Sequence, residues 1–233
     1  MSVNIYPKVV FKVLMVVIFV LLLADIAGIV SKIYFNHGRL YGLVPWFNFN
    51  NELSVPTLYS SLALLLASGL LLWIALIEKS LNKSWVPWLG FMLLFLFLCI
   101  DESVTIHEQL TEPFRDLLHL SGVFYYAWIV PYGVAFLVFS AVYCKFLISL
   151  PRQQLGLFIL SGVVFLSGAI GLEMAGGNLA SVHSEQGLAY ALCYTGEEFL
   201  EMTGVAIFVY SLLFYISRYL KPAVLVIEVR NET

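Results

Sequence analysis

Acidic side chains and histidines gather at the ends of three apolar segments of this chain. They are Asp101, Glu102, His107 and Glu108 after the third apolar segment, Glu173 and His183 near the end of the fifth, and Glu197, Glu198 and Glu201 at the start of the sixth. A carboxylate in or beside hydrocarbon is costly, so a membrane protein that keeps one usually has a use for it. Carboxylates and imidazoles from facing helices form a ligand set that suits iron, manganese or zinc. We therefore predict a divalent-metal site, with these candidate ligands: Asp101, Glu102, His107, Glu108, Glu173, His183, Glu198 and Glu201.

The spacing of these residues predicts how two helices present them. If the third segment continues outward as one helix, Asp101, Thr105 and Glu108 stack on one face. Glu197 and Glu201 are four residues apart, so one helical turn presents a carboxylate cluster. Acidic residues at the start of a helix also complement its dipole, and this gives the cluster a purely structural alternative.

Few basic residues accompany the acidic ones. Arg115 is the nearest arginine in sequence, and no lysine is close to the cluster. Like charges in a low-dielectric setting cannot all ionise, so either protons or a cation must neutralise them. Both bound metal and retained protons fit this shortage of basic partners, and Asp25 in the first apolar segment is a further candidate member of the cluster.

Other kinds of site receive less support. The Glu-x-x-His motif of di-iron bundles is absent, and the nearest substitutes are His107-Glu108 and His183-Ser-Glu185. A bis-histidine haem would require His107 to face His183. The sequence contains neither an indicated nucleophile triad nor a glycine-rich phosphate loop.

The composition indicates in which surroundings the chain folds. Of 233 residues, 61% are hydrophobic and 12% are charged, with a net charge of −3. Soluble domains are about 45–50% apolar and about 25% charged, so the surroundings of this chain must be lipid. No basic stripe with interleaved aromatic residues is present, which argues against nucleic-acid binding.

Six segments are long and apolar enough to cross a bilayer, which takes about 20 residues. The expected spans are about 9–30, 57–77, 85–104, 122–143, 155–174 and 198–217. We predict an all-α, polytopic transmembrane helix bundle that forms a single membrane domain over 1–233. Pro131 falls inside the fourth expected span and should kink it. Small residues recur along the fifth span, which predicts a central helix with close neighbours.

The distribution of Lys and Arg predicts the orientation. Nine of the twelve lie in the two termini and in the 78–84 and 144–154 loops. Because cytoplasmic loops retain positive charge, both termini are expected in the cytoplasm. The 31–56, 105–121 and 175–197 loops then face outward, and so does the acidic cluster. The long 31–56 loop mixes aromatic and amide residues, which suits either a lid in the headgroup region or a plain interfacial anchor.

Three motifs carry a resemblance to a known group of proteins. They are Asn51–Thr57 with Tyr59–Ser61, Leu98–Glu108 with its DExxxxHE pattern, and Glu197–Gly204 with its EExxEMxG pattern. Together they resemble a family of bacterial multipass membrane proteins with no established activity. The resemblance implies a bacterial inner-membrane location and implies nothing about chemistry.

These observations favour a membrane protein with a periplasmic carboxylate–histidine metal site. Its action would be that of an oxidoreductase or a hydrolase on a lipid-soluble substrate, since a metal-bound water can serve as nucleophile. A proton- or cation-coupled transporter is an alternative, although the inner halves of the spans carry few polar residues. A non-catalytic subunit or sensor that docks on a membrane-protein partner is another.

Overall fold

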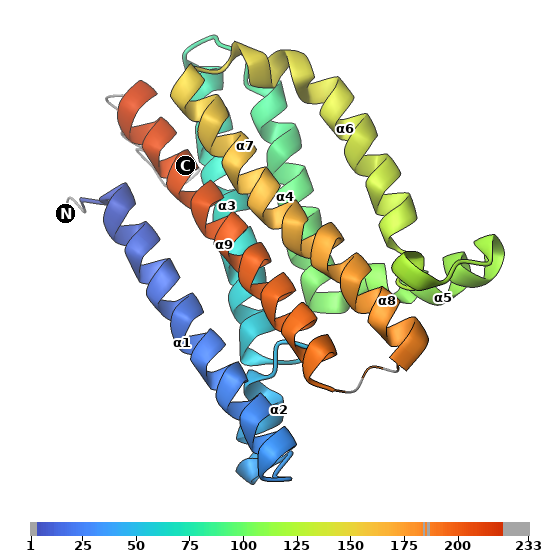
Figure 1. Cartoon of the computed structure of the whole chain (residues 1–233). Helices are drawn as coiled ribbons and strands as arrows, with labels where there is room; N and C mark the ends of the chain where they lie inside the picture. Colours follow the sequence, from blue (N-terminus) through green and yellow to red (C-terminus); the bar gives the residue numbers. More distant parts are fainter. Residues whose placement is uncertain (1–3, 184, 186, 221–233) are drawn as a thin grey trace, which may run out of the picture.

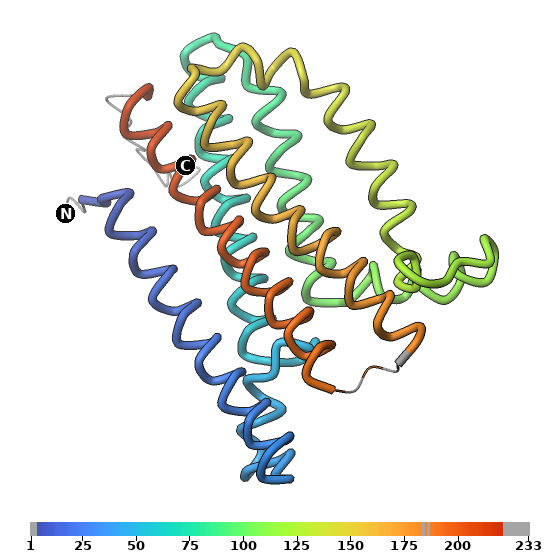
Figure 2. Tube along the Cα trace, viewed as in Figure 1, coloured from blue at the N-terminus to red at the C-terminus, as the bar shows by residue number. Residues whose placement is uncertain are grey.

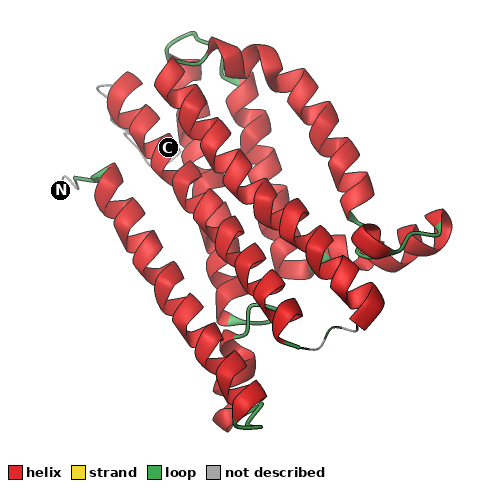
Figure 3. Ribbon diagram, viewed as in Figure 1, coloured by secondary structure: helices red, strands yellow, loops and turns green. Residues whose placement is uncertain are grey.

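The computed structural model describes residues 4–183, 185 and 187–220, and the regular elements in these residues are all helical (Figure 3). The α-helices are α1 (Pro7–Tyr34), α2 (Leu43–Phe47), α3 (Val55–Ser80), α4 (Val86–Val104), α5 (Ile106–Leu118), α6 (Ile129–Ser149), α7 (Arg152–Leu166), α8 (Glu173–His183) and α9 (Leu188–Tyr219). Short 3₁₀ turns lie at η1 (Leu40–Gly42) and η2 (Gly122–Phe124), and a π-helical segment, η3 (Ser167–Leu172), joins α7 to α8.

The prediction of six apolar helices is confirmed for this part of the chain. The described residues contain six helices long and apolar enough to cross a membrane, with α7, η3 and most of α8 together forming the fifth. The last helix starts at Leu188, much earlier than the predicted residue 198, directly after Gly187 with its φ of 111°. The fourth helix starts at Ile129 rather than near Gly122, because His119 and Gly122 take positive φ and turn the chain.

Pro131 does not kink its helix, contrary to the prediction. It is the third residue of α6 and so lies in the first turn. Backbone N–H groups in the first turn of a helix have no intrahelical acceptor, and a proline there removes nothing. The later start of α6 thus makes Pro131 compatible with a regular helix.

Helix α9 lies at the centre of the bundle. It packs against α1, α3 and α7 along its length, as Figures 1 and 2 show from one viewpoint. The sequence pattern instead assigned the central place to the fifth span. That span does approach α9 closely, because its small residues and those of α9 leave room for the facing backbone.

The closest approach of α7 and α9 predicts a stability effect. A Cβ added at Gly204 would lie 2.7 Å from both the backbone nitrogen and the Cβ of Phe165. We expect Gly204→Ala to destabilise the folded protein by about 1–3 kcal/mol, because overpacking forces a helix to shift. Thermal unfolding in detergent measures this. A matched control is Gly156→Ala in α7, where a Cβ meets nothing within 4 Å; equal Tm values for the two variants would contradict the close contact.

An aromatic core fills the end of the bundle where α1 begins and α9 ends. Trp88 is 1% exposed, and its ring lies 4.7 Å from the Tyr215 ring and 5.2 Å from the Phe146 ring. Phe91 of α4 meets Phe139 of α6 edge-on at 5.2 Å. These rings attach α6 to α4 at this end, and the opposite end of the bundle holds the polar residues.

Candidate functional site

A cavity of about 810 Å³ lies between α4, α6, α7 and α9. This volume is in the upper part of the range of roughly 300–1,000 Å³ that is usual for ligand sites. Among the described residues, nine carboxyl groups line it, and neither a lysine nor an arginine does. The nine belong to Glu52, Asp101, Glu102, Glu108, Glu173, Glu185, Glu197, Glu198 and Glu201. We call the part of the cavity that they surround the acidic end.

A sharp turn after α4 builds one side of the acidic end. Thr105 takes a left-handed conformation with φ 57°, and α5 starts at Ile106 in a new direction. The predicted stack of Asp101, Thr105 and Glu108 on one continuous helix is therefore wrong. The turn instead folds His107 back onto Asp101, which neither the spacing nor the residue types indicated.

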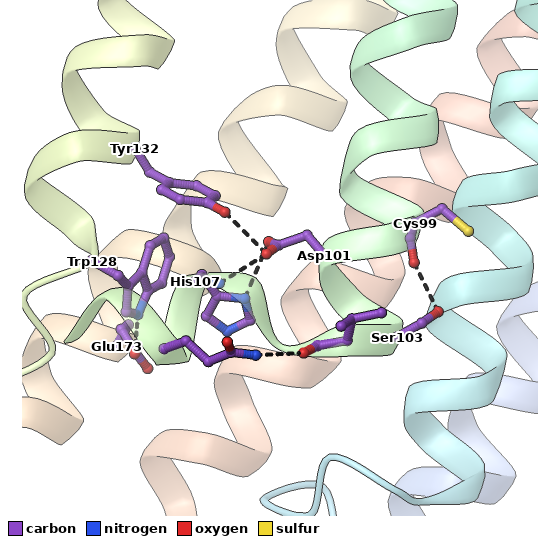
Figure 4. Close-up of polar contacts among 9 residues, drawn as sticks. Cys99, Asp101, Ser103, His107, Trp128, Tyr132 and Glu173 are labelled. Atoms are coloured by element: carbon purple, nitrogen blue, oxygen red, sulfur yellow. Dashed lines mark hydrogen bonds and ion pairs between the residues drawn. The ribbon is translucent and has the colours of Figure 1, made fainter. Parts of the chain in front are cut away.

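Asp101 is held by three donors (Figure 4). Its Oδ1 accepts the backbone N–H of His107 at 2.9 Å and the hydroxyl of Tyr132 at 3.0 Å. Its Oδ2 lies 3.1 Å from Nδ1 of the His107 ring. Asp101 thus links α4, α5 and α6, and Nε2 of His107 has no hydrogen-bond partner among the described residues.

The imidazole of His107 favours its protonated form. Burial alone would lower its pKa, but the hydrogen bond and the negative charge of Asp101, together with Glu52 and Glu201, outweigh burial and raise the pKa to about 9. The ring also stands edge-on to Trp128, with centroids 5.0 Å apart. At neutral pH, His107 is therefore a cation fixed at the edge of an anionic cavity.

Aromatic donors at the start of α6 form the opposite wall. Nε1 of Trp128 donates to Oε1 of Glu173 at 2.8 Å, which ties α6 to α8. The hydroxyl of Tyr126 lies 2.7 Å from that of Tyr190 and donates to Oε1 of Glu185 at 3.2 Å. Burial, followed by the contact with Tyr190, raises the pKa of Tyr126, so it stays a neutral donor. The sequence pattern did not indicate Tyr126, Trp128 or Tyr190, although Tyr126 and Trp128 follow closely after the 105–121 loop.

The segment before α3 closes the acidic end. Phe49, Asn50 and Glu52 line the cavity, and Phe49 is 3% exposed. Asp25 of α1 holds this segment: its Oδ1 accepts the N–H of Phe49 at 3.0 Å, and its Oδ2 accepts the hydroxyl of Thr195 at 2.7 Å. Part of the 31–56 loop therefore covers the cavity, as a lid would. Asp25, a suggested member of the cluster, fastens this cover and does not line the cavity itself.

Glu52 joins the acidic cluster from this covering segment, although the sequence pattern did not indicate it. Its carboxyl group lies close to that of Glu108, near enough for the two to interact directly. Burial, followed by the charge and hydrogen bond of Glu108 and the charge of Glu102, raises the pKa of Glu52 to about 8. No periodicity links residue 52 to the other acids, so only the tertiary fold brings it here.

The three glutamates of α9 complete the cluster. Glu198 and Glu201 both lie within electrostatic range of Glu52, Glu102 and Glu173. The side chain of Glu197 hydrogen-bonds that of Glu173. Because α9 starts at Leu188, these glutamates lie beyond its first turn, where the helix dipole has little effect. The dipole-compensation alternative is therefore wrong for this cluster.

Two local features shape this part of the site. The π-helical segment η3 directly precedes Glu173, and such segments are frequent at functional sites. A Cβ added at Gly168 within it would lie 2.5 Å from the carbonyl oxygen of Glu197, so α9 passes very close to η3. The pair Glu173–Glu197 thus depends on a glycine at position 168.

The structure gathers most of the predicted metal ligands at one cavity. Those that line it are Asp101, Glu102, His107, Glu108, Glu173, Glu198 and Glu201. The side chain of His183, the remaining candidate, lies outside the described residues, and with it the proposed His107–His183 pair. Within the described residues, no group of three or more His, Cys, Asp or Glu is arranged to hold a metal ion.

A buried hydroxyl also faces the cavity. Ser60 of α3 lines it and is 8% exposed, and its Oγ has no hydrogen-bond partner among the described residues. An unpaired buried hydroxyl costs free energy, so this group has a hydrogen bond available for a bound molecule. This donor is independent of the acidic cluster and points to a ligand.

The sequence profile of a family described as Domain of unknown function (DUF8692) matches residues 12–216. The chain belongs to the DUF8692 family. The matched region of this DUF8692 member contains every residue named above for the cavity wall. Neither a curated protein nor a solved structure matches the chain. The family thus agrees with a resemblance to proteins of no established activity, and the site must be interpreted from its own chemistry.

Proposed function

We propose that this protein is an integral membrane protein of the bacterial inner membrane that binds a divalent metal ion at the periplasmic, acidic end of its cavity. There it acts on a lipid-soluble substrate, as an oxidoreductase or a hydrolase. The observation that carries the proposal is the set of nine carboxyl groups around one cavity, without a lysine or arginine among the described lining residues. Such a set needs positive charge to ionise.

The carboxyl groups differ in the interaction partners that they already have. Asp101 is occupied by His107 and Tyr132, and Glu52 is paired with Glu108. Glu102, Glu198 and Glu201 have neither kind of partner and lie within electrostatic range of one another. We propose these three as the principal ligands. Since they do not form a ligand group in the structure, metal binding requires their side chains to rotate toward one another.

The surrounding residues suit acid–base work on a bound substrate. A metal held by carboxylates would polarise a substrate oxygen or activate water. His107 carries a proton at neutral pH, held in place by Asp101, and its Nε2 is unpaired within the described part of the chain. A positioned group of this kind serves as a general acid. We therefore propose His107 as the proton donor to the substrate.

The cavity lining gives less support to a transport pathway that runs through the membrane. Away from the acidic end, the polar side chains among its described lining residues are Ser140 and Ser161, and Ser161 donates to its own helix. A proton or ion pathway requires polar groups through the membrane midplane. This favours a site that is closed toward the other side of the membrane.

The metal content of the purified protein tests the proposal. We expect about one metal ion or more per chain in protein purified without chelators, measured by elemental mass spectrometry, and about tenfold less in Glu102→Gln/Glu198→Gln, since loss of ligands removes the site. A matched control is Glu112→Gln on α5, whose side chain is 84% exposed. Failure of the native protein to hold iron, manganese or zinc, even after incubation with each, rejects the metal site.

Cysteine labelling tests the orientation. In a chain with Cys99, Cys144 and Cys193 replaced, we expect Leu117→Cys on α5 to react with an impermeant maleimide on intact spheroplasts, because Leu117 is 72% exposed. Ser84→Cys, in the exposed turn between α3 and α4, should react only after permeabilisation. The reverse pattern would place the acidic end in the cytoplasm.

A further inference from the structure

The cavity extends far beyond the carboxyl groups. Its lining residues run from Trp128, directly before α6, to Leu147 near the end of α6, which corresponds to roughly 28 Å at 1.5 Å per residue. This is close to the ~30 Å hydrocarbon thickness of a bilayer. We call the part that leads away from the acidic end the apolar arm. Its walls are apolar, and the aromatic rings among them include Phe91, Phe95, Phe139, Phe158 and Phe208.

The width of the cavity fits a hydrocarbon chain. Dividing its volume of about 810 Å³ by the length of roughly 28 Å gives an average cross-section of about 29 Å². Carbon atoms in contact stay roughly 4 Å apart, so this section is wide enough for an extended hydrocarbon chain. The arm is thus suited to an alkyl chain.

The apolar arm opens sideways, between α6 and α7. Phe136 of α6 and Ile159 and Val163 of α7 line the cavity, yet they are 42%, 55% and 57% exposed. Within α6, all of which the structure describes, Ile129 is the one buried residue. Figure 1 shows α6 standing apart from α7 along most of its length. In a membrane this opening faces hydrocarbon, so an alkyl chain can enter from the bilayer.

The acidic end selects the head of such a molecule. In the metal-free protein nine carboxyl groups face it, so a phosphate, sulfate or carboxylate head would meet like charge. The same region is lined by Tyr126, Trp128, Tyr132, Tyr190 and Tyr194. Aromatic faces attract cations, and tyrosine hydroxyls pair with neutral polar groups. The unpaired hydroxyl of Ser60 adds a further hydrogen-bonding group.

We infer that the cavity binds an amphiphile without negative charge, with an alkyl chain in the apolar arm and its uncharged or cationic head at the acidic end. The inference deepens the proposed function by naming the substrate class. Only the placement of the head rests on the proposed function. The apolar arm is formed by residues other than those that would hold the metal.

Two glycines allow the arm to be blocked without a clash. Gly162 of α7 and Gly133 of α6 both line the cavity, and a Cβ at either position meets nothing within 4 Å. Gly162→Phe or Gly133→Phe therefore fills the arm with a ring. Gly156→Phe is the matched control, since Gly156 lies on α7 with the same free space and is not part of the cavity wall.

The probes are photoreactive long-chain alcohol, amine and fatty acid with the same chain, added to the full protein in phosphatidylcholine vesicles. We expect saturable labelling of α6 and α7 peptides by the alcohol and the amine, and about tenfold less by the fatty acid. Loss of about two buried methylene groups already weakens binding about tenfold, so Gly162→Phe and Gly133→Phe should lower labelling at least that much. Gly156→Phe should label like the native protein.

Equal labelling of Gly162→Phe, Gly133→Phe and the native protein would overturn the inference, as would equal labelling by the fatty acid or by a two-chain phospholipid probe. Measuring metal content and labelling on the same native protein separates this inference from the metal proposal. If the native protein holds no metal but labels as expected, the metal proposal fails and the amphiphile site stands. If it holds metal but fails to label, the reverse is true.

Discussion

Asp101→Asn is expected to lower the free energy of unfolding by about 3 kcal/mol below pH 6.5, and by progressively less as the pH rises toward 10. Removing one partner of a buried ion pair typically costs about 3–5 kcal/mol. Asp101 is 6% exposed and accepts bonds from His107 and Tyr132, so asparagine keeps the shape but loses the charge. The largest effect is expected where His107 is protonated.

The sign of this pH dependence follows from the pKa of His107. The folded protein raises this pKa from 6.5 to about 9, so it binds the proton more tightly than the unfolded chain does. The resulting stability is fully present below pH 6.5 and is lost as the pH rises through 9. Without the charge of Asp101, the pKa falls back, and the slope between these pH values should flatten.

Glu52→Gln provides the matched comparison. The pKa of Glu52 is also raised, from 4.5 to about 8, so the folded protein favours its neutral form. Its stabilising contribution is full below pH 4.5 and is lost as the pH rises through 8. Glutamine should therefore flatten the lower part of the profile, between pH 4.5 and 8. Thermal unfolding of both variants across pH 5–10 measures this, and an Asp101→Asn profile parallel to that of the native protein would disprove the ion pair.

The sequence predicted the spans well because length and apolarity alone determine them. All six expected spans overlap a long helix in the described residues. It also identified most of the acidic residues of the cavity, since charged groups within hydrocarbon-length helices stand out against their surroundings. Glu197, noted within the α9 cluster but not chosen as a ligand, lines the cavity as well.

The remaining features depend on contacts that no periodicity encodes. Thr105 carries no sequence signal for a left-handed turn, yet its conformation determines that His107 meets Asp101. The cover over the acidic end is fixed by Asp25, which was noted as a carboxylate but not as an acceptor for the backbone of Phe49. Such long-range pairs follow from tertiary packing, which a hydropathy pattern does not describe.

Glu198→Gln is expected to make the metal-free protein more stable, by about 1–3 kcal/mol. Glu198 lies within electrostatic range of four other carboxyl groups, those of Glu52, Glu102, Glu173 and Glu201. Replacing buried ion pairs by neutral residues of similar volume is often neutral or stabilising, by about 1–4 kcal/mol, and removing one of several mutually repelling carboxylates should act in the same direction. When replacing a residue raises the free energy of unfolding, the native residue serves binding rather than folding.

Metal should reverse this order. A ligand that binds only the folded state stabilises it by about 4.1 kcal/mol at a thousand times its Kd, more than the gain of about 1–3 kcal/mol expected for the variant. The native protein would gain this stability and Glu198→Gln would not, so the two melting curves should exchange places on addition of metal. Glu112→Gln, on the exposed face of α5, should follow the native protein within ~0.5 kcal/mol under both conditions. A Glu198→Gln variant that is less stable than the native protein without metal would instead show that Glu198 stabilises the fold, because neutralising it would then have removed a favourable interaction rather than a repulsive one.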